Sequence, residues 1–167
     1  TDWAKVMRSR YPASFVRPLN KKGTVYALED DSSSVVVKYL PITQFGHSEL
    51  CYTQLFSSDL GPHVVDITFL ETSVEMVLER ADTTLSHLPV HNSKHLLTLA
   101  QDLAFLCYEL EQRGLGHYDL KESNVLCYSR EGDREVLRLA DFGFTMPLRY
   151  YQENYLGIAF GTTGYIP

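Results

Sequence analysis

Four mostly apolar runs, rich in β-branched and aromatic residues, predict short β-strands in the first half of the chain. They lie at 23–28, 35–40, 64–70 and 73–78 and are bounded by turn-forming residues. The polar run at 30–34 predicts a hairpin turn between the first two stretches, and Pro41 ends the second. Helical spacing over about 47 to 57 predicts one helix, with Gly46 weakening its start.

The hydrophobic period changes in the second half. Apolar residues recur at helical spacing from Leu96 to Leu110, with Ser93 as a candidate N-cap and Gly114 and Gly116 as the helix stop. Two short strands are predicted at 125–128 and 136–139, around a turn at 130–134. From Phe144 onward the pattern is aperiodic, which predicts a long loop. The pattern as a whole predicts an α+β protein.

Composition narrows the class of protein. The 167 residues are 44% apolar and 22% charged, which is typical of a folded domain and not of a disordered chain. Fifteen Lys and Arg against 21 Asp and Glu give a net charge of −6. Nucleic-acid and anionic-membrane binders need clustered positive charge, so we expect neither a nucleic acid nor a membrane as partner.

Cysteine usage and the N-terminus bear on the compartment. Cys51, Cys107 and Cys127 are odd in number and lack CxxC spacing, so we expect free thiols, mostly buried, in a reducing environment. No apolar run is long enough to cross a bilayer, and the Thr-Asp-Trp-Ala-Lys start does not resemble a secretory signal. These features predict a cytoplasmic or nuclear protein.

Two polar motifs carry the chemistry. The chain has His-Tyr-Asp-Leu-Lys-Glu-Ser-Asn at 117–124 and Asp-Phe-Gly at 141–143, after the amphipathic helix. In this order and at this distance they resemble the catalytic and metal-binding loops of eukaryotic-type Ser/Thr protein kinases. Val-Val-Val-Lys at 35–38 resembles the lysine strand of that family, and residues 161–167 resemble the end of its activation segment. The resemblance runs from about Pro18 to Pro167.

The resemblance implies a kinase-like fold, with a β-rich small lobe and hinge over residues 1–81 and a truncated helical lobe over 82–167. It also implies a role for each motif residue. Lys38 would bind the ATP phosphates and Glu49, the only acidic residue between Lys38 and Asp59, would pair with it. Asp119 and Lys121 would be catalytic, the first toward the substrate hydroxyl and the second toward the γ-phosphate. Asn124 and Asp141 would bind Mg²⁺.

Further ATP contacts are implied around the nucleotide. Leu78 matches the position before the hinge, and Glu79, Arg80 and Ala81 match the hinge itself. Gly23 and Val25 match the end of the glycine-rich loop, in which Pro18 and Asn20 replace the first two glycines. Asn20 is able to adopt a left-handed backbone, but Pro18 has no N–H to donate. Val36 replaces the usual alanine and should narrow the adenine pocket.

Two further departures bear on activity. Tyr118 replaces the arginine that in this family pairs with a phosphorylated activation loop, so we expect activity that does not depend on that pairing. Pro167 lies where the family has the alanine of its APE motif, and the helices that usually follow are absent. The sequence is consistent with both a fragment and a minimal kinase-like chain, and the exposed large-lobe surface is a candidate for self-association.

The sequence therefore predicts ATP- and magnesium-dependent phosphorylation of Ser or Thr in a protein substrate. The alternative is a weak or inactive kinase-like binding module that regulates a partner such as a kinase, which the altered glycine loop favours and the complete set of motif residues opposes. A small-molecule kinase is a minor third hypothesis. His87, His91 and His95 have metal-ligand spacing, but Pro89 interrupts any helix that would align them.

Overall fold

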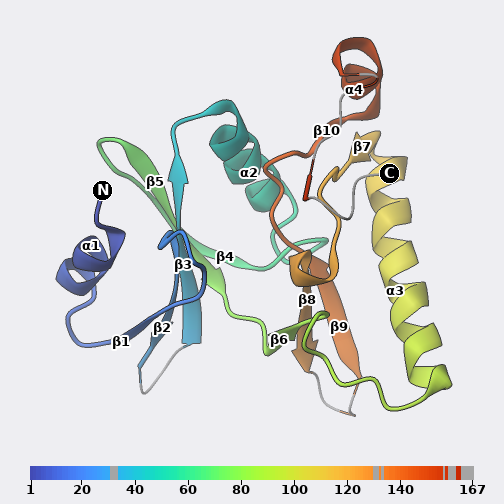
Figure 1. Ribbon diagram of the computed structural model, residues 1–167, viewed down its shortest axis with the longest axis horizontal. Coiled ribbons are helices and arrows are strands. Elements are labelled where there is room, and N and C mark those ends of the chain that lie inside the picture. Colours follow the sequence, from blue (N-terminus) through green and yellow to red (C-terminus); the bar gives the residue numbers. More distant parts are fainter. Residues whose placement is uncertain (31–33, 130–131, 133, 156, 158–160, 163–167) are drawn as a thin grey trace.

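A five-stranded antiparallel sheet forms most of the first half of the chain (Figure 1). The computed structural model describes residues 1–30, 34–129, 132, 134–155, 157 and 161–162. The strands lie in the order β1-β2-β3-β5-β4. Their bounds are β1 Phe15–Pro18, β2 Val25–Glu29, β3 Ser34–Pro41, β4 Val64–Phe69 and β5 Ser73–Glu79. The four strands predicted at 23–28, 35–40, 64–70 and 73–78 are confirmed as β2, β3, β4 and β5. Most of the turn expected at 30–34 lies outside the described residues.

The two faces of this sheet are covered by different elements. On one face, Val37, Tyr39 and Val77 pack with Met7 of helix α1 (Trp3–Arg10). On the other, Leu40 and Met76 pack with helix α2 (Gln44–Leu55). Successive side chains of a strand point to opposite faces, so both faces of the central strands are buried.

The α1 helix encloses a buried acid. Glu75 of β5 is 0% exposed and accepts two hydrogen bonds from Arg10, at 2.6 Å and 2.8 Å. The hydroxyls of Tyr11 and Tyr39 donate to the same carboxylate, each at 2.8 Å, and the Trp3 ring stacks on Tyr39 at 4.3 Å. A buried carboxylate requires such partners, so α1 is part of the packed structure.

Helix α2 begins earlier than its sequence pattern suggested. Thr43 is the N-cap and its hydroxyl accepts from the Gly46 N–H at 3.2 Å, which fixes the first turn. A Cβ at Gly46 would lie 2.0 Å from the Pro41 carbonyl oxygen. The glycine is thus required by a close backbone approach and does not mark a weak helix start.

The second half is built on one long helix and a small sheet. Helix α3 (Ser93–Gln112) packs Leu99, Leu106 and Leu110 against a three-stranded sheet in the order β6-β8-β9. The bounds are β6 Thr83–Thr84, β8 Val125–Ser129 and β9 Glu135–Leu139, which confirms the two predicted strands. The N-cap of α3 is Asn92, not Ser93: its side chain accepts from the His95 N–H at 2.9 Å.

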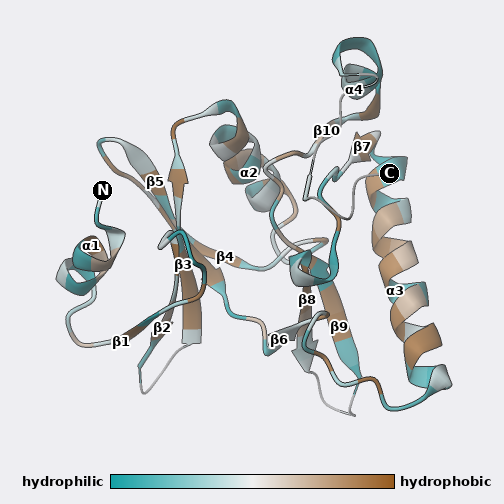
Figure 2. Cartoon of the chain, in the orientation of Figure 1, coloured by the Kyte–Doolittle hydropathy of each residue, from teal (hydrophilic) through white to brown (hydrophobic). Residues whose placement is uncertain are grey.

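Helix α3 carries many apolar residues on the side visible in Figure 2. Its outer side chains Leu97, Phe105 and Tyr108 are 59%, 60% and 52% exposed. Among the helices of the described residues, none combines the length and the apolar composition needed to cross a bilayer. The thiols are free, as predicted, but only Cys127 is fully buried and Cys51 is exposed.

The prediction of a featureless loop after Phe144 was wrong. Strand β10 (Met146–Pro147) pairs with β7 (Leu115–Gly116), and helix α4 (Leu148–Asn154) follows directly. α4 buries none of its residues. It shows no hydrophobic period because it is fixed by pairing of its preceding strand and by one aromatic contact, described below.

Candidate active site

A narrow cavity lies between the large and small sheets and contains most of the residues predicted to contact ATP. Its volume is about 180 Å³, below the roughly 300–1,000 Å³ of common ligand pockets. Its lining includes the predicted Val25, Val36, Lys38, Glu49, Glu79, Ala81 and Asp141. Arg80 lies in the same connection but pairs with Glu29. Gly23 is not among the lining residues.

Strand β3 and helix α2 bring Lys38 and Glu49 together. The Lys38 ammonium forms an ion pair with the Glu49 carboxylate, as predicted. Glu49 is 8% exposed. Burial raises the pKa of the Glu49 carboxyl, the Lys38 charge opposes this, and the nearby Asp141 charge adds to it. Lys38 is therefore held at the cavity wall with a fixed charge partner and with Asp141 close by.

His117 connects the two predicted chemical loops. Its Nε2 donates to the Ala140 carbonyl at 2.8 Å, and its Nδ1 accepts from the Asp119 N–H at 3.2 Å. These two bonds need the neutral imidazole with the proton on Nε2. Burial lowers the pKa of His117, although the carbonyl of Ala140 and the charges of Asp141 and Asp119 oppose the shift. The ring therefore fixes Asp119 beside the chain segment that carries Asp141.

Asn124 closes the same loop. Its side-chain amide nitrogen donates to the Asp119 backbone oxygen at 2.8 Å, and its backbone carbonyl accepts from the Ala140 N–H at 2.9 Å. Asp141, one residue further on, has a left-handed backbone (φ 59°). Such a conformation is uncommon for a non-glycine residue and persists where surrounding contacts impose it, often at functional sites. Phe142, fully buried against Phe56 and the His117 ring, is such a contact.

Asp119 and Lys121 share one hydroxyl group. The Thr162 Oγ1 donates to Asp119 Oδ1 at 2.9 Å and accepts from Lys121 Nζ at 2.5 Å. Asp119 is 7% exposed. Among the described residues, the other carboxylate oxygen, Oδ2, has one long contact, of 3.4 Å, to the Asn124 side-chain amide nitrogen. An acid and a base converge here on an aliphatic hydroxyl. Residues 163–167 of the motif at 161–167 lie outside the described residues.

The loop between β1 and β2 is closed by its own hydrogen bonds. The Asn20 Oδ1 accepts from the N–H groups of Thr24 at 3.0 Å and Val25 at 3.2 Å, and the Gly23 N–H donates to the Asn20 carbonyl at 3.3 Å. Of the loop residues, Gly23 has positive φ (67°) and Asn20 does not. Asn20 therefore acts through its side chain and its carbonyl, and the N–H groups of Gly23, Thr24 and Val25 are all bonded within the loop.

The sequence interpretation missed several residues of the site. Leu19, Thr53, Met76, Leu126 and Ala140 also line the cavity. Strand alternation was the available signal for Met76, which shares a face with Leu78. Leu19 and Leu126 required the packing of the two sheets, which the sequence pattern does not specify. Thr162 lacked a signal for its contacts, because it approaches Asp119 over a separation of 43 residues.

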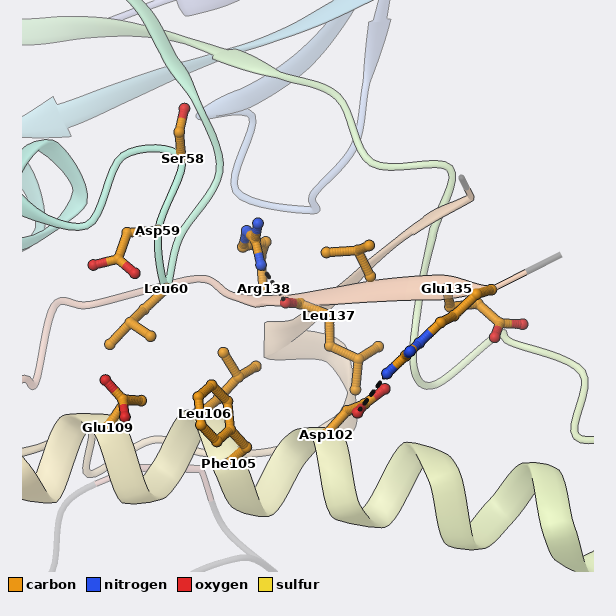
Figure 3. Close-up of a pocket in the computed structure, with 12 residues that line it drawn as sticks. Ser58, Asp59, Leu60, Asp102, Phe105, Leu106, Glu109, Glu135, Leu137 and Arg138 are labelled. Carbon is orange, nitrogen blue, oxygen red and sulfur yellow. Dashed lines mark hydrogen bonds and ion pairs between the residues drawn. The ribbon is translucent and has the colours of Figure 1, made fainter. Parts of the chain in front are cut away.

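A second hollow, of about 560 Å³, lies between α3 and β9 (Figure 3). Acidic side chains around it are already paired: Asp59 with Arg113 at 2.8 Å, Asp102 with Arg134 at 3.6 Å and Glu135 with His95 at 3.1 Å. His95 is thus engaged with Glu135, and no group of three metal-ligating side chains occurs within the described ranges. The structure gives no metal site at the histidine motif.

Comparison with known proteins finds a short kinase similarity. A stretch of 40 residues is 48% identical to ribosomal protein S6 kinase 2 beta and, equally, to ribosomal protein S6 kinase 2 alpha, both from Xenopus laevis. The stretch covers 24% of this chain and 6% of each relative. No family model matches the chain. The comparison supports a kinase-like relationship over a short segment of a mixed α/β protein.

Proposed function

We propose that the protein transfers the γ-phosphoryl group of ATP to a Ser or Thr hydroxyl of a protein substrate, with Mg²⁺ as cofactor. The observation that carries this proposal is the hydroxyl of Thr162, held between Asp119 and Lys121. The same loop is tied through His117 and Asn124 to the segment of Asp141, which lines a cavity with Lys38. A hydroxyl-binding pair thus lies next to groups suited to phosphate and metal.

The donor set fits magnesium. Mg²⁺ prefers oxygen ligands and is commonly held by one or two protein groups together with substrate phosphates and water. Asp141 offers a carboxylate, and Asn124 offers its amide oxygen because its amide nitrogen is bonded to Asp119. When bound, the metal would neutralise charge on the phosphates.

The cavity has apolar walls and a charged end. Leu19, Val25, Val36 and Leu126 supply walls for a planar base, whereas Lys38 supplies a positive charge for phosphates. Glu49 holds that ammonium in place. The small volume of about 180 Å³ is consistent with the narrowing expected from Val36.

Asp119 would orient the accepting hydroxyl and take its proton. Its Oδ1 is bonded to Thr162, so Oδ2 is the oxygen available for a substrate. Lys121 lies on the same hydroxyl and would place a positive charge beside the transferred group. An aliphatic hydroxyl already fits between these two side chains, which favours Ser and Thr over Tyr as acceptors.

The test is a transfer assay with radiolabelled ATP and a library of Ser/Thr peptides, with and without Mg²⁺. Asp119→Asn should remove transfer by at least about a hundredfold while leaving ATP binding unchanged. Asp141→Asn should remove the magnesium dependence of ATP binding in a thermal unfolding scan. Asp66→Asn, on exposed positions of β4, is the control for a lost carboxylate. Equal transfer by the wild type and Asp119→Asn would refute the proposed role.

A second candidate is a kinase-like binding module that acts on a partner protein without turnover. The closed loop favours it, because Asn20 occupies N–H groups that would otherwise bind phosphate. No magnesium-dependent stabilisation at millimolar ATP would favour this candidate. Asn20→Gly then separates the two, since it should restore ATP binding only if the loop is the obstacle.

A further inference from the structure

Tyr118, next to the proposed catalytic Asp119, has a backbone conformation that aromatic residues rarely adopt. Its φ is 62°, in the left-handed region. This backbone conformation costs free energy and persists only where surrounding contacts impose it.

The ring of Tyr118 contacts both another tyrosine and a glycine. It stacks on the Tyr151 ring of α4, with 4.4 Å between centroids and 21° between planes. It also lies against Gly116, where a Cβ would lie 2.5 Å from Tyr118 Cε2. The position of the ring therefore requires a residue without a side chain at 116. Burial raises the pKa of the Tyr118 hydroxyl, so the ring is uncharged at neutral pH.

Within the part of the chain that the structure describes, helix α4 is attached mainly at its start. It buries no residue of its own, and its N-cap, Pro147, makes no side-chain cap bond. Its entry is fixed by the pairing of Met146 with Gly116 and by the Leu148 N–H, which donates to the Gly114 carbonyl at 2.9 Å. Beyond that entry, the Tyr118–Tyr151 stack is the ring contact between α4 and the loop that carries Asp119.

The backbone of Tyr118 lies close to Gly161, the residue before Thr162. A Cβ at Gly161 would lie 2.9 Å from the Tyr118 carbonyl oxygen and 3.2 Å from Asp119 Oδ1. Gly161 is thus needed for the close approach that places Thr162 on Asp119. Tyr118 therefore contacts α4 through its side chain, and its backbone carbonyl lies beside Gly161, next to Thr162.

We propose that Tyr118 is a positioning residue that fixes α4 against the catalytic loop by stacking on Tyr151. The effect of this stacking on catalysis rests on the proposed function, whereas its effect on the position of α4 does not.

The test is hydrogen–deuterium exchange of the α4 amides in the protein without ATP, which requires no catalytic activity. Tyr118→Gly removes the ring and also relieves the positive φ, so any loosening of α4 cannot be caused by added backbone strain. Loss of the free energy of one aromatic pair should make amide exchange in α4 about two- to twelvefold faster in Tyr118→Gly than in the wild type. Tyr151→Ala should give the same increase from the other side, and Tyr118→Phe should retain wild-type exchange.

The amides of α3 are the internal control, because a general loss of stability would raise exchange in both helices. Unchanged α4 exchange in Tyr118→Gly and Tyr151→Ala would overturn the proposal, as would an equal increase in α3. If transfer is found, Tyr118→Gly should raise the KM for the peptide and leave the KM for ATP unchanged, with Tyr118→Phe restoring it. Absence of transfer by the wild type would refute the proposed function and leave the exchange result intact.

Discussion

Replacing Arg10 with methionine should reveal how strongly α1 holds the first sheet. The change removes the two guanidinium hydrogen bonds to Glu75, which is 0% exposed. The hydroxyls of Tyr11 and Tyr39 remain as its donors. Removing one partner of a buried ion pair costs about 3–5 kcal/mol. Because 35% of the Arg10 side chain is exposed and the tyrosines remain, we expect the lower end of this range.

The assay is urea unfolding of four proteins: the wild type, Arg10→Met, Glu75→Gln and the double variant. With a neutral glutamine at position 75, Arg10→Met should cost under about 1 kcal/mol, because no buried charge loses its partner. The coupling energy should then be about 2 kcal/mol. In a thermal scan, Arg10→Met alone should lower Tm by about 6–12 °C.

Arg8→Met is the matched control, since Arg8 is an exposed cation on the same helix. It should change stability by less than about 0.5 kcal/mol. If Arg10→Met costs the same in both backgrounds at position 75, the ion pair does not account for the stability. The reasoning from the buried carboxylate would then be wrong.

Other changes probe the remaining features. Burial lowers the pKa of His117 from 6.5, so the folded state binds fewer protons than the unfolded state below that pH; stability should fall as the pH drops through 6.5, and His117→Gln should flatten this slope in urea midpoints. The Thr145 hydroxyl is buried without a partner among the described residues, so Thr145→Val should stabilise by up to about 1 kcal/mol, and a loss of that size in urea unfolding would contradict the assignment. Gly46→Ala should cost about 1–3 kcal/mol, measured in the same way, because its Cβ would meet the Pro41 carbonyl. Val36→Ala should tighten ATP binding in calorimetry by widening the cavity, and weaker binding would count against that role.

The parts of the fold set by local periodicity were predictable. Strands β2 to β5 are short runs rich in β-branched and aromatic residues, and helix α3 has apolar residues at helical spacing; the observed positions agree with the predicted ones within a few residues. Helix α1 gave no such signal, because its stability comes from Glu75, which is 65 residues away from Arg10 in the chain. Helix α4 was missed for a similar reason: its contact with Tyr118 spans distant parts of the chain.

The candidate site follows the same division. The Lys38–Glu49 pair was implied by the kinase resemblance and supported by the fact that Glu49 is the only acidic residue between Lys38 and Asp59, and the structure shows the contact. The Thr162 contact and the closed loop at Asn20 depend on three-dimensional approach and on side-chain hydrogen bonds. Motif order indicates which residues belong to a site, whereas their bonding partners are determined by the fold.

The carboxylate of Glu75 also constrains the order in which the protein folds. Arg10 of α1 and its partner Glu75 of β5 are separated by 65 residues in the chain. Closing so long a loop is slow, while the β8–β9 hairpin and α3 form from local contacts. We therefore expect α1 to dock late in folding, and the refolding rate of Arg10→Met, which should equal that of the wild type, would test this. Strengthening the contact between Arg10 and Glu75 should then slow unfolding without speeding folding. The docking of α1 would contribute to the kinetic stability of the protein.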